Sequence, residues 1–199
     1  MSGVDGGAID GSWYLDLLSF ARETPWLHGF FQIFTNAGLV LYVLAVAAAW
    51  WRARGDAGRT AAVLWVPIAV VLAYGVSNLV KIVVEEPRPC IRYPAVPTVS
   101  SCDFATDYSF PSNHVTIAVA AAVALLPADR RLGVTGLAVA AVIGFSRVYL
   151  GAHYVHDVLA GAVLGALVAL CGLLVRAPLT ALVTRSRVFS PDFHLHQGE

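Results

Sequence analysis

Residues 146–157 read SRVYLGAHYVHD and place one arginine, two histidines and one aspartate at the end of an apolar stretch of chain. Charged side chains are costly inside a bilayer, so a cluster of them beside an apolar helix indicates a functional site. His153 and Asp157 are four residues apart, a spacing that stacks two side chains on one face of a helix. A carboxylate at that distance can hold one imidazole nitrogen and leave the other free to react.

The composition of the whole chain is typical of a membrane protein. Of its 199 residues, 58% are hydrophobic and 13% are charged, which leaves too little polar surface to cover a soluble domain. The formal net charge is zero, which argues against a nucleic-acid partner. No linker, repeat or low-complexity run divides the sequence. We therefore expect one membrane-embedded domain over residues 1–199, and the sequence leaves its oligomeric state open.

The apolar runs predict an all-α bundle with about five transmembrane helices. The expected spans cover residues 26–51, 60–84, 112–126, 132–149 and 155–175. Residues 13–23 mix tryptophan and leucine with polar neighbours, which favours a helix lying in the membrane interface. Residues 85–110 contain several prolines and acidic residues, so this segment is expected to be a loop outside the bilayer.

The basic residues predict the orientation of the bundle. Eight of the thirteen Lys and Arg residues fall on the side of the short turns and the C-terminal segment: Arg52, Arg54, Arg59, Arg130, Arg131, Arg176, Arg185 and Arg187. An excess of basic residues marks the cytoplasmic side of a membrane protein. We therefore expect a multi-pass protein of the cell membrane, with the loop 85–110 extracytoplasmic and a tail at 177–199 cytoplasmic.

Two cysteines lie in the loop that is expected on the outer face. An oxidising compartment allows Cys90 and Cys102 to form a disulfide, and closing a loop of that size contributes about 3 kcal/mol on the chain-entropy account. We predict this bridge. The third cysteine, Cys171, lies in the last expected span and is predicted to be a packing residue. The same span carries Gly161 and Gly165 at a spacing that permits close contact between helices.

Three segments bring polar residues to helix ends on the expected outer face. They are KIVVEEPRP at 81–89, PSNH at 111–114 and the stretch at 146–157. Their cations suit a phosphoryl group, and the free N–H groups at the start of the helix after residue 111 favour an anion. The candidate phosphate-binding residues are Lys81, Arg88, Ser112, Asn113 and Arg147.

Two histidines have the chemistry that phosphoryl transfer requires. His153 is a candidate nucleophile, because a phosphoramidate intermediate divides one hard displacement into two easier ones. Asp157 would fix the tautomer of that imidazole. His114, on another helix, can protonate the departing oxygen near neutral pH.

The pattern of lysine, six residues, Arg-Pro, then Pro-Ser-x-His, then Ser-Arg, five residues, His, three residues, Asp resembles the three-part signature of the type 2 phosphatidic acid phosphatase superfamily. The resemblance implies that His153 is the nucleophile, Asp157 its orienting partner and His114 the general acid. It also implies phosphate binding by Lys81, Arg88, Ser112 and Arg147, with no metal and no other cofactor. The family pattern has glycine where this chain has Asn113. Asparagine tolerates left-handed backbone geometry, so we expect its amide to face the phosphate.

The function expected from these features is the hydrolysis of a terminal phosphate from a membrane lipid. A polyprenyl diphosphate at the outer leaflet is the first candidate substrate, and phosphatidylglycerophosphate or phosphatidate is the rival. A lipid phosphotransferase and a non-catalytic lipid binder or translocator are the alternatives. A metal site containing His153 and His156 is disfavoured, since the sequence offers no third ligand. Glu85, Glu86 and Arg92 are expected to lie in a solvated loop without a role.

Overall fold

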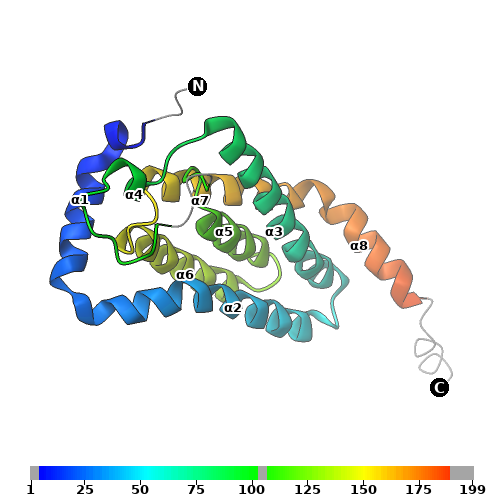
Figure 1. Cartoon of the computed structure of the whole chain (residues 1–199). Helices are drawn as coiled ribbons and strands as arrows, with labels where there is room; N and C mark the ends of the chain where they lie inside the picture. Colours follow the sequence, from blue (N-terminus) through cyan, green and yellow to red (C-terminus); the bar gives the residue numbers. More distant parts are fainter. Residues whose placement is uncertain (1–4, 103–106, 189–199) are drawn as a thin grey trace, which may run out of the picture.

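The computed structural model describes residues 5–102 and 107–188, and this part of the chain is a bundle of helices (Figure 1). Its elements are α1 (Gly7–Glu23), a 3-10 turn (Pro25–Leu27), α2 (His28–Ala53), α3 (Ala57–Val84), α4 (Pro89–Arg92), α5 (Asn113–Leu125), α6 (Arg130–Tyr149), α7 (Val155–Leu170) and α8 (Gly172–Val188).

The predicted class of fold, an all-α multi-pass membrane bundle, is confirmed. Within residues 5–102 and 107–188, four helical segments are long and apolar enough to cross a membrane: Pro25–Ala53, Ala57–Arg92, Arg130–Tyr149 and Val155–Ser186. The remaining predicted span is α5, which is apolar but has only 13 residues. At 1.5 Å per residue α5 is about 20 Å long, shorter than the ~30 Å hydrocarbon core.

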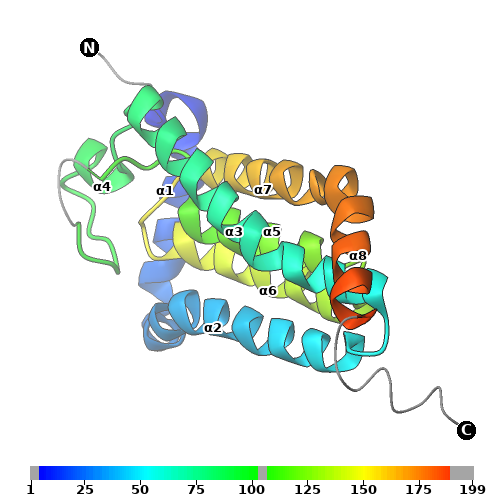
Figure 2. The ribbon, with the colours of Figure 1, turned by 90° about the vertical axis from the view of Figure 1, so that its right-hand side faces the viewer.

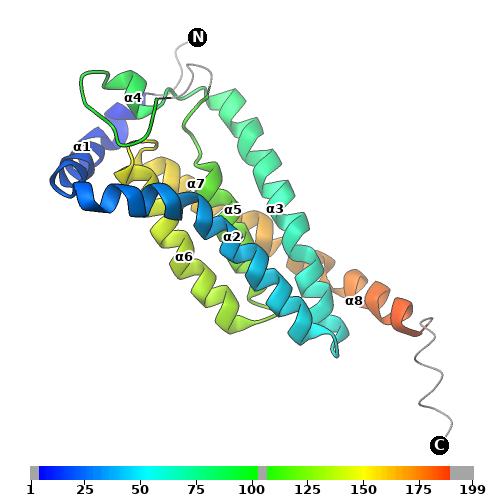
Figure 3. The same cartoon turned by 60° about the horizontal axis from the view of Figure 1, so that its bottom comes forward.

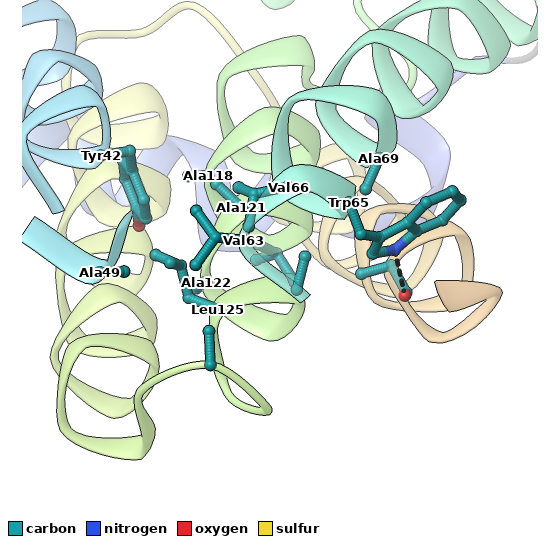
Figure 4. Close-up of a cluster of buried hydrophobic side chains, with 14 of the residues drawn as sticks. Tyr42, Ala49, Val63, Trp65, Val66, Ala69, Ala118, Ala121, Ala122 and Leu125 are labelled. Carbon is teal, nitrogen blue, oxygen red and sulfur yellow. Dashed lines mark hydrogen bonds between the residues drawn. The ribbon is translucent and has the colours of Figure 1, made fainter. Parts of the chain in front are cut away.

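The helix α5 lies in the middle of the bundle, against α3, α6 and α7 (Figures 2 and 3). Its buried face consists mostly of alanine and valine, which allow neighbouring helices to approach closely. Figure 4 shows the core around it, with Tyr42 and Trp65 as its largest labelled side chains. Their polar atoms are satisfied, since Tyr42 donates to the carbonyl of Gly136 at 2.6 Å and Trp65 donates to the carbonyl of Ala169 at 2.9 Å.

Two glycines of α7 permit the contact with α5. A Cβ atom added at Gly165 would lie 2.4 Å from the carbonyl oxygen of Thr116, and one at Gly161 would lie 2.8 Å from that of Ser112. Both distances are too short for a real side chain. The spacing that indicated close helix contact therefore fixes α7 directly against α5.

Aspartate caps hold the short turns at the end of the bundle opposite the loop 85–110. Asp56 accepts from the amide of Arg59 at 2.9 Å, at the start of α3. Asp129 accepts from the amides of Arg131 and Leu132 at 3.0 and 3.1 Å, at the start of α6. Burial acts to raise the pKa of Asp129, but these amides and the Arg52 guanidinium at 2.9 Å lower it overall.

The C-terminal part of the structure differs from the prediction. The predicted span 155–175 is broken, because α7 ends at Leu170 and a new helix, α8, runs on to Val188 in another direction (Figure 2). The predicted tail from residue 177 is helical as far as Val188, as part of α8, and residues 189–199 lie outside the described part. Gly172 lies against the indole of Trp65, where a Cβ atom would be 2.4 Å from Nε1. Cys171 at this break is exposed, so it is not the packing residue that was predicted.

The N-terminal helix α1 begins at Gly7, earlier than the predicted residue 13. Trp13 is 63% exposed, whereas Tyr14 and Leu18 are fully buried against the segment that leads into α7. The hydroxyl of Tyr14 donates to the carbonyl of Gly151 at 3.3 Å. Helix α1 thus packs directly on the loop that carries the quoted motif.

The loop after α3 contains the short helix α4 and the predicted pair of cysteines. Cys90 and Cys102 form a disulfide with a Cα–Cα distance of 5.9 Å. The described part of this loop lies at the same end of the bundle as α1 and the starts of α5 and α7 (Figures 1 and 2).

Candidate active site

The pair His153 and Asp157 is formed at the start of α7. The Nδ1 atom of His153 lies 3.2 Å from Oδ2 of Asp157, and the amide of Tyr154 donates to the same oxygen at 2.9 Å. His153 is 2% exposed and Asp157 is fully buried. Because an ionised carboxylate only accepts hydrogen bonds, Nδ1 carries the proton and the lone pair of a neutral His153 lies on Nε2. This is the tautomer that a nucleophilic imidazole needs.

The charge of His153 is set by its burial and by the cations around it. Burial, followed by the charges of Arg147, Arg88 and Lys81, lowers the pKa of His153 well below its usual value. A smaller contribution of the same sign comes from His114. The imidazole is therefore neutral at neutral pH. These four neighbours come from all three of the segments that the sequence analysis identified.

Two of the three cations are held in place by backbone carbonyls. Arg88 donates to the carbonyls of Ala152 and Asp107, both at 2.9 Å, and to the Asp107 carboxylate at 2.5 Å. Lys81 is 7% exposed and donates to the carbonyls of Tyr108 and Ser109, the latter at 3.2 Å. The loop that follows α3 therefore fixes both cations beside α7.

Unpaired donors identify the place for an anion. Within the described residues, the Ser112 hydroxyl and Nε of Arg147 are buried without a hydrogen-bond partner. Buried donors of this kind are costly unless a ligand satisfies them. Arg147 also lines a cavity of about 210 Å³, together with Arg88, Asp107 and Ala152. The arrangement fits a phosphoryl group, which offers several acceptor oxygens and negative charge.

The start of α5 lies against the start of α7. Ser112 is the residue before the first turn of α5, and its amide donates to the carbonyl of Asp157 at 3.1 Å. His114 follows in that turn, with Nε2 3.1 Å from Oδ1 of Asn36 on α2. Sequence reasoning missed Asn36, although a lone amide within an apolar span was a usable signal. The contact orients the candidate general acid.

Asn113 does not adopt the backbone geometry that was expected. It lies in the helix α5, and Glu85 is the one non-glycine with a positive φ in the described part of the chain. The side chain of Asn113 instead accepts from the Ser77 hydroxyl at 2.5 Å and donates to Asn78 at 3.1 Å. It thus ties α5 to the helix that carries Lys81, and the left-handed explanation is wrong.

The prediction that Glu86 lies in a solvated loop is also wrong. The left-handed turn at Glu85, with φ of 51°, ends α3 and directs the chain inward. Glu86 is 1% exposed, and one of its oxygens lies 3.0 Å from Nε2 of His156. Arg92 does lie at the surface, where it pairs with Asp5 at 3.2 Å. No local sequence signal distinguished Glu86 from Glu85.

A comparison with known proteins matches the region of the chain that contains these three segments. Residues 62–181 match the PAP2 superfamily, and this range contains every residue of the three-part motif. The chain belongs to the PAP2 superfamily. It is 31% identical over 134 residues to undecaprenyl-diphosphatase BcrC of Bacillus subtilis (strain 168), which is 67% of each sequence.

Two solved structures of PAP2 type share the fold. One is a transmembrane PAP2-type phosphatidylglycerolphosphate phosphatase from Bacillus subtilis, with a TM-score of 0.61, 23% identity and coverage of 82% of this chain and 84% of that one. The other is LpxE of Aquifex aeolicus, with a TM-score of 0.64, 22% identity and coverage of 86% and 99%. The PAP2 fold therefore extends beyond the matched motif to most of this chain.

Proposed function

We propose that this PAP2 protein removes the terminal phosphate of a polyprenyl diphosphate at the outer leaflet of the cell membrane. The observation that carries the proposal is the placement of neutral His153 against Asp157, with Lys81 and Arg88 of the segment 81–89 and Arg147 of its own segment acting on it. The similarity to an undecaprenyl-diphosphatase favours a polyprenyl diphosphate over the rival lipid phosphates.

The proposed reaction has two displacements at phosphorus. Nε2 of His153 attacks the terminal phosphorus, the bond from phosphorus to the bridging oxygen breaks, and His114 in its imidazolium form gives a proton to that oxygen. The negative charge of the bound diphosphate favours this protonated form of His114. A water molecule then attacks the phospho-histidine and loses a proton to His114, which releases inorganic phosphate. Asp157 accepts from Nδ1 throughout and stabilises the positive charge that develops on the ring. His153 is thereby returned to its starting form.

The chain's own cations are proposed to neutralise the phosphoryl charge without a metal ion. Lys81, Arg88 and Arg147 surround His153, and the Ser112 hydroxyl is a free donor among the described residues. Phosphoryl transfer depends mostly on such positioning and charge neutralisation. Arg88 must exchange its contact with Asp107 for the substrate, and the exposed position of Asp107 allows this exchange.

The test is phosphate release by the purified protein from three lipids in the presence of EDTA. The panel holds a polyprenyl diphosphate, phosphatidylglycerophosphate and phosphatidate, and we expect the fastest release from the first. His153→Ala should abolish release, whereas His28→Gln, a change at a histidine that contacts the Ala21 carbonyl, should not. Consumption of lipid without free phosphate would indicate a phosphotransferase. Loss of activity on chelation would contradict the metal-free mechanism.

The orientation is a separate part of the proposal and has its own test. Positively charged residues gather at the turns around Gly55 and Asp129, at the end opposite the site. In a Cys171→Ser background, an impermeant maleimide added to intact cells should label Ala95→Cys, which is in the loop, and should not label Gly55→Cys. Both positions are exposed, so the reverse labelling pattern would refute the outward-facing site.

A further inference from the structure

Charged side chains from three distant segments meet beside the catalytic aspartate. They are Asp10 of α1, Glu86 after α3, and His156 with Asp157 on α7. Their side chains are 9%, 1%, 16% and 0% exposed, respectively. No step of the proposed reaction uses Asp10, Glu86 or His156. Burying three carboxylates together is costly unless a positive charge lies among them.

The hydrogen bonds of His156 fix its charge. Nδ1 lies 2.9 Å from Oδ1 of Asp10, and Nε2 lies 3.0 and 3.2 Å from the two oxygens of Glu86. Carboxylates accept and do not donate, so both ring nitrogens must carry a proton. His156 is therefore an imidazolium. Its ring also stacks against those of Tyr154 and Phe110, at centroid distances of 5.4 and 5.9 Å, an environment that favours a cation.

Among the three carboxylates, Asp157 depends most on the positive charge of His156. Its Oδ2 atom holds Nδ1 of His153 and the amide of Tyr154, whereas Oδ1 is buried and makes no hydrogen bond within the described residues. The imidazolium lies nearest to that oxygen, with Nε2 of His156 at 3.4 Å. Burial, and then the like charge of Glu86, favour the protonated acid, and the imidazolium of His156 opposes both. A protonated Asp157 would hold His153 less firmly.

We infer that His156 is a positioning residue, whose imidazolium keeps Asp157 ionised beside Glu86 so that Asp157 holds Nδ1 of His153 and leaves Nε2 free to attack. Helix α1 completes the arrangement, because Asp10 binds both the ring and the backbone amide of His156, the latter at 2.7 Å. This inference rests on the proposed role of His153 as the nucleophile. It connects the N-terminal helix to the reacting ring through the contacts of Asp10 with His156, His156 with Asp157, and Asp157 with His153.

The groups that face Asp157 come from several elements. His153 and His156 lie on its own segment, Glu86 and Ser109 belong to the loop after α3, and Lys81 lies on α3. The Ser109 hydroxyl also lies 3.4 Å from Glu86. Of these groups, Glu86 is the one that carries the same negative charge as Asp157 and therefore disfavours its ionisation. Neutralising Glu86 should therefore compensate for the loss of the His156 cation.

The experiment compares His156→Gln with the double variant His156→Gln/Glu86→Gln. For the single variant we expect kcat to fall about 10- to 100-fold with KM within about threefold, because the ring of His153 is misplaced while the phosphate site is intact. The acidic limb of the profile of kcat/KM against pH should move up by at least about one pH unit, since a unit charge 3.4 Å from Asp157 is lost. The double variant should have a kcat at least about tenfold higher than that of the single variant. Its acidic limb should return to the wild-type position.

Two controls separate this inference from its alternatives. Asp5→Asn removes a carboxylate from the same end of the chain, which contacts the exposed Arg92 and the amide of Gly7, and should keep the wild-type profile. Glu86, His156 and Asp157 also bring three candidate ligand atoms within 4.8 Å of one another. A bound cation held there would lose two ligands in the double variant, so recovery of activity excludes that explanation.

Thermal midpoints of the same variants test the charge pairing without any substrate. Glu86→Gln should raise the midpoint of the His156→Gln protein while lowering that of the wild type. If the wild type releases phosphate from none of the three lipids, the proposed function fails, but this reversal of sign still tests the pairing. An unchanged pH profile in His156→Gln, or a second substitution that makes activity and stability worse, would overturn the inference.

Discussion

Replacing Gly165 by alanine tests how closely α7 must lie against α5. The new Cβ atom would lie 2.4 Å from the carbonyl oxygen of Thr116 and 3.0 Å from the amide of Ala120, both backbone atoms of α5. Ordinary contacts at such a Cβ begin at 3.4 Å. The two helices must therefore separate by about 1 Å, because neither contacting atom can rotate away.

The size of the effect follows from a matched control. Gly75→Ala adds the same methyl group to the interior of α3, where nothing lies within 4 Å. Both substitutions gain about 1 kcal/mol of helix propensity, so their difference isolates the clash. Overpacking of this kind costs about 1–3 kcal/mol. For a chain of this size, that difference lowers the thermal midpoint of Gly165→Ala by about 2–12 °C relative to Gly75→Ala.

Activity should fall along with stability, because α5 carries His114 and α7 begins beside His153. A displacement of about 1 Å between reacting groups can cost about 100-fold in rate. The assay is kcat for phosphate release, measured below both midpoints, together with thermal unfolding in the same detergent. Equal midpoints and equal kcat for the two alanine variants would refute the close packing of α5 and α7.

Three further predictions concern other parts of the molecule. Asp129→Ala removes the cap of α6 and should lower the free energy of unfolding by about 1 kcal/mol, with little added by loss of the exposed Arg52 pair; an unchanged midpoint would contradict the role of the cap. Cys90→Ser/Cys102→Ser opens a loop with a sequence separation of 12 and should cost about 3 kcal/mol, so a midpoint equal to that of the oxidised wild type would contradict it. The pKa of His153 is lowered on folding, so the unfolded chain binds a proton that the folded protein does not, and stability falls as the pH drops below about 6.5. His153→Gln should remove about 1.4 kcal/mol of the loss seen at pH 5.5, and equal acid sensitivity of the variant and wild type would disprove this.

The residues brought together at the site could be predicted because their chemistry is encoded locally. The spacing of His153 and Asp157 is a property of one helix, and the residues before His114 open another. The apolar runs likewise predicted the long helices, since each is judged from consecutive residues. Sequence reasoning was reliable wherever a single element contained the whole signal.

The features that were missed depend on contacts between distant segments. Asp10 and His156 are 146 positions apart, and their pairing requires α1 to fold back onto α7. The burial of Glu86 follows from a left-handed turn at Glu85. Such a turn is usually indicated by a glycine, and this position has none. The break after Leu170 occurs where Gly172 meets the indole of Trp65 on another helix. Hydrophobicity along the chain carries no information about such contacts.

The central position of α5 encloses His114, the proposed general acid, among other helices of the bundle. Its neighbours α3, α6 and α7 are the helices that must adjust when the hydrocarbon layer becomes thicker or thinner. A helix of 13 residues enclosed by those neighbours does not itself have to match the layer. The position of His114 should therefore respond less to bilayer thickness than that of His153 and Asp157, which lie at the start of α7.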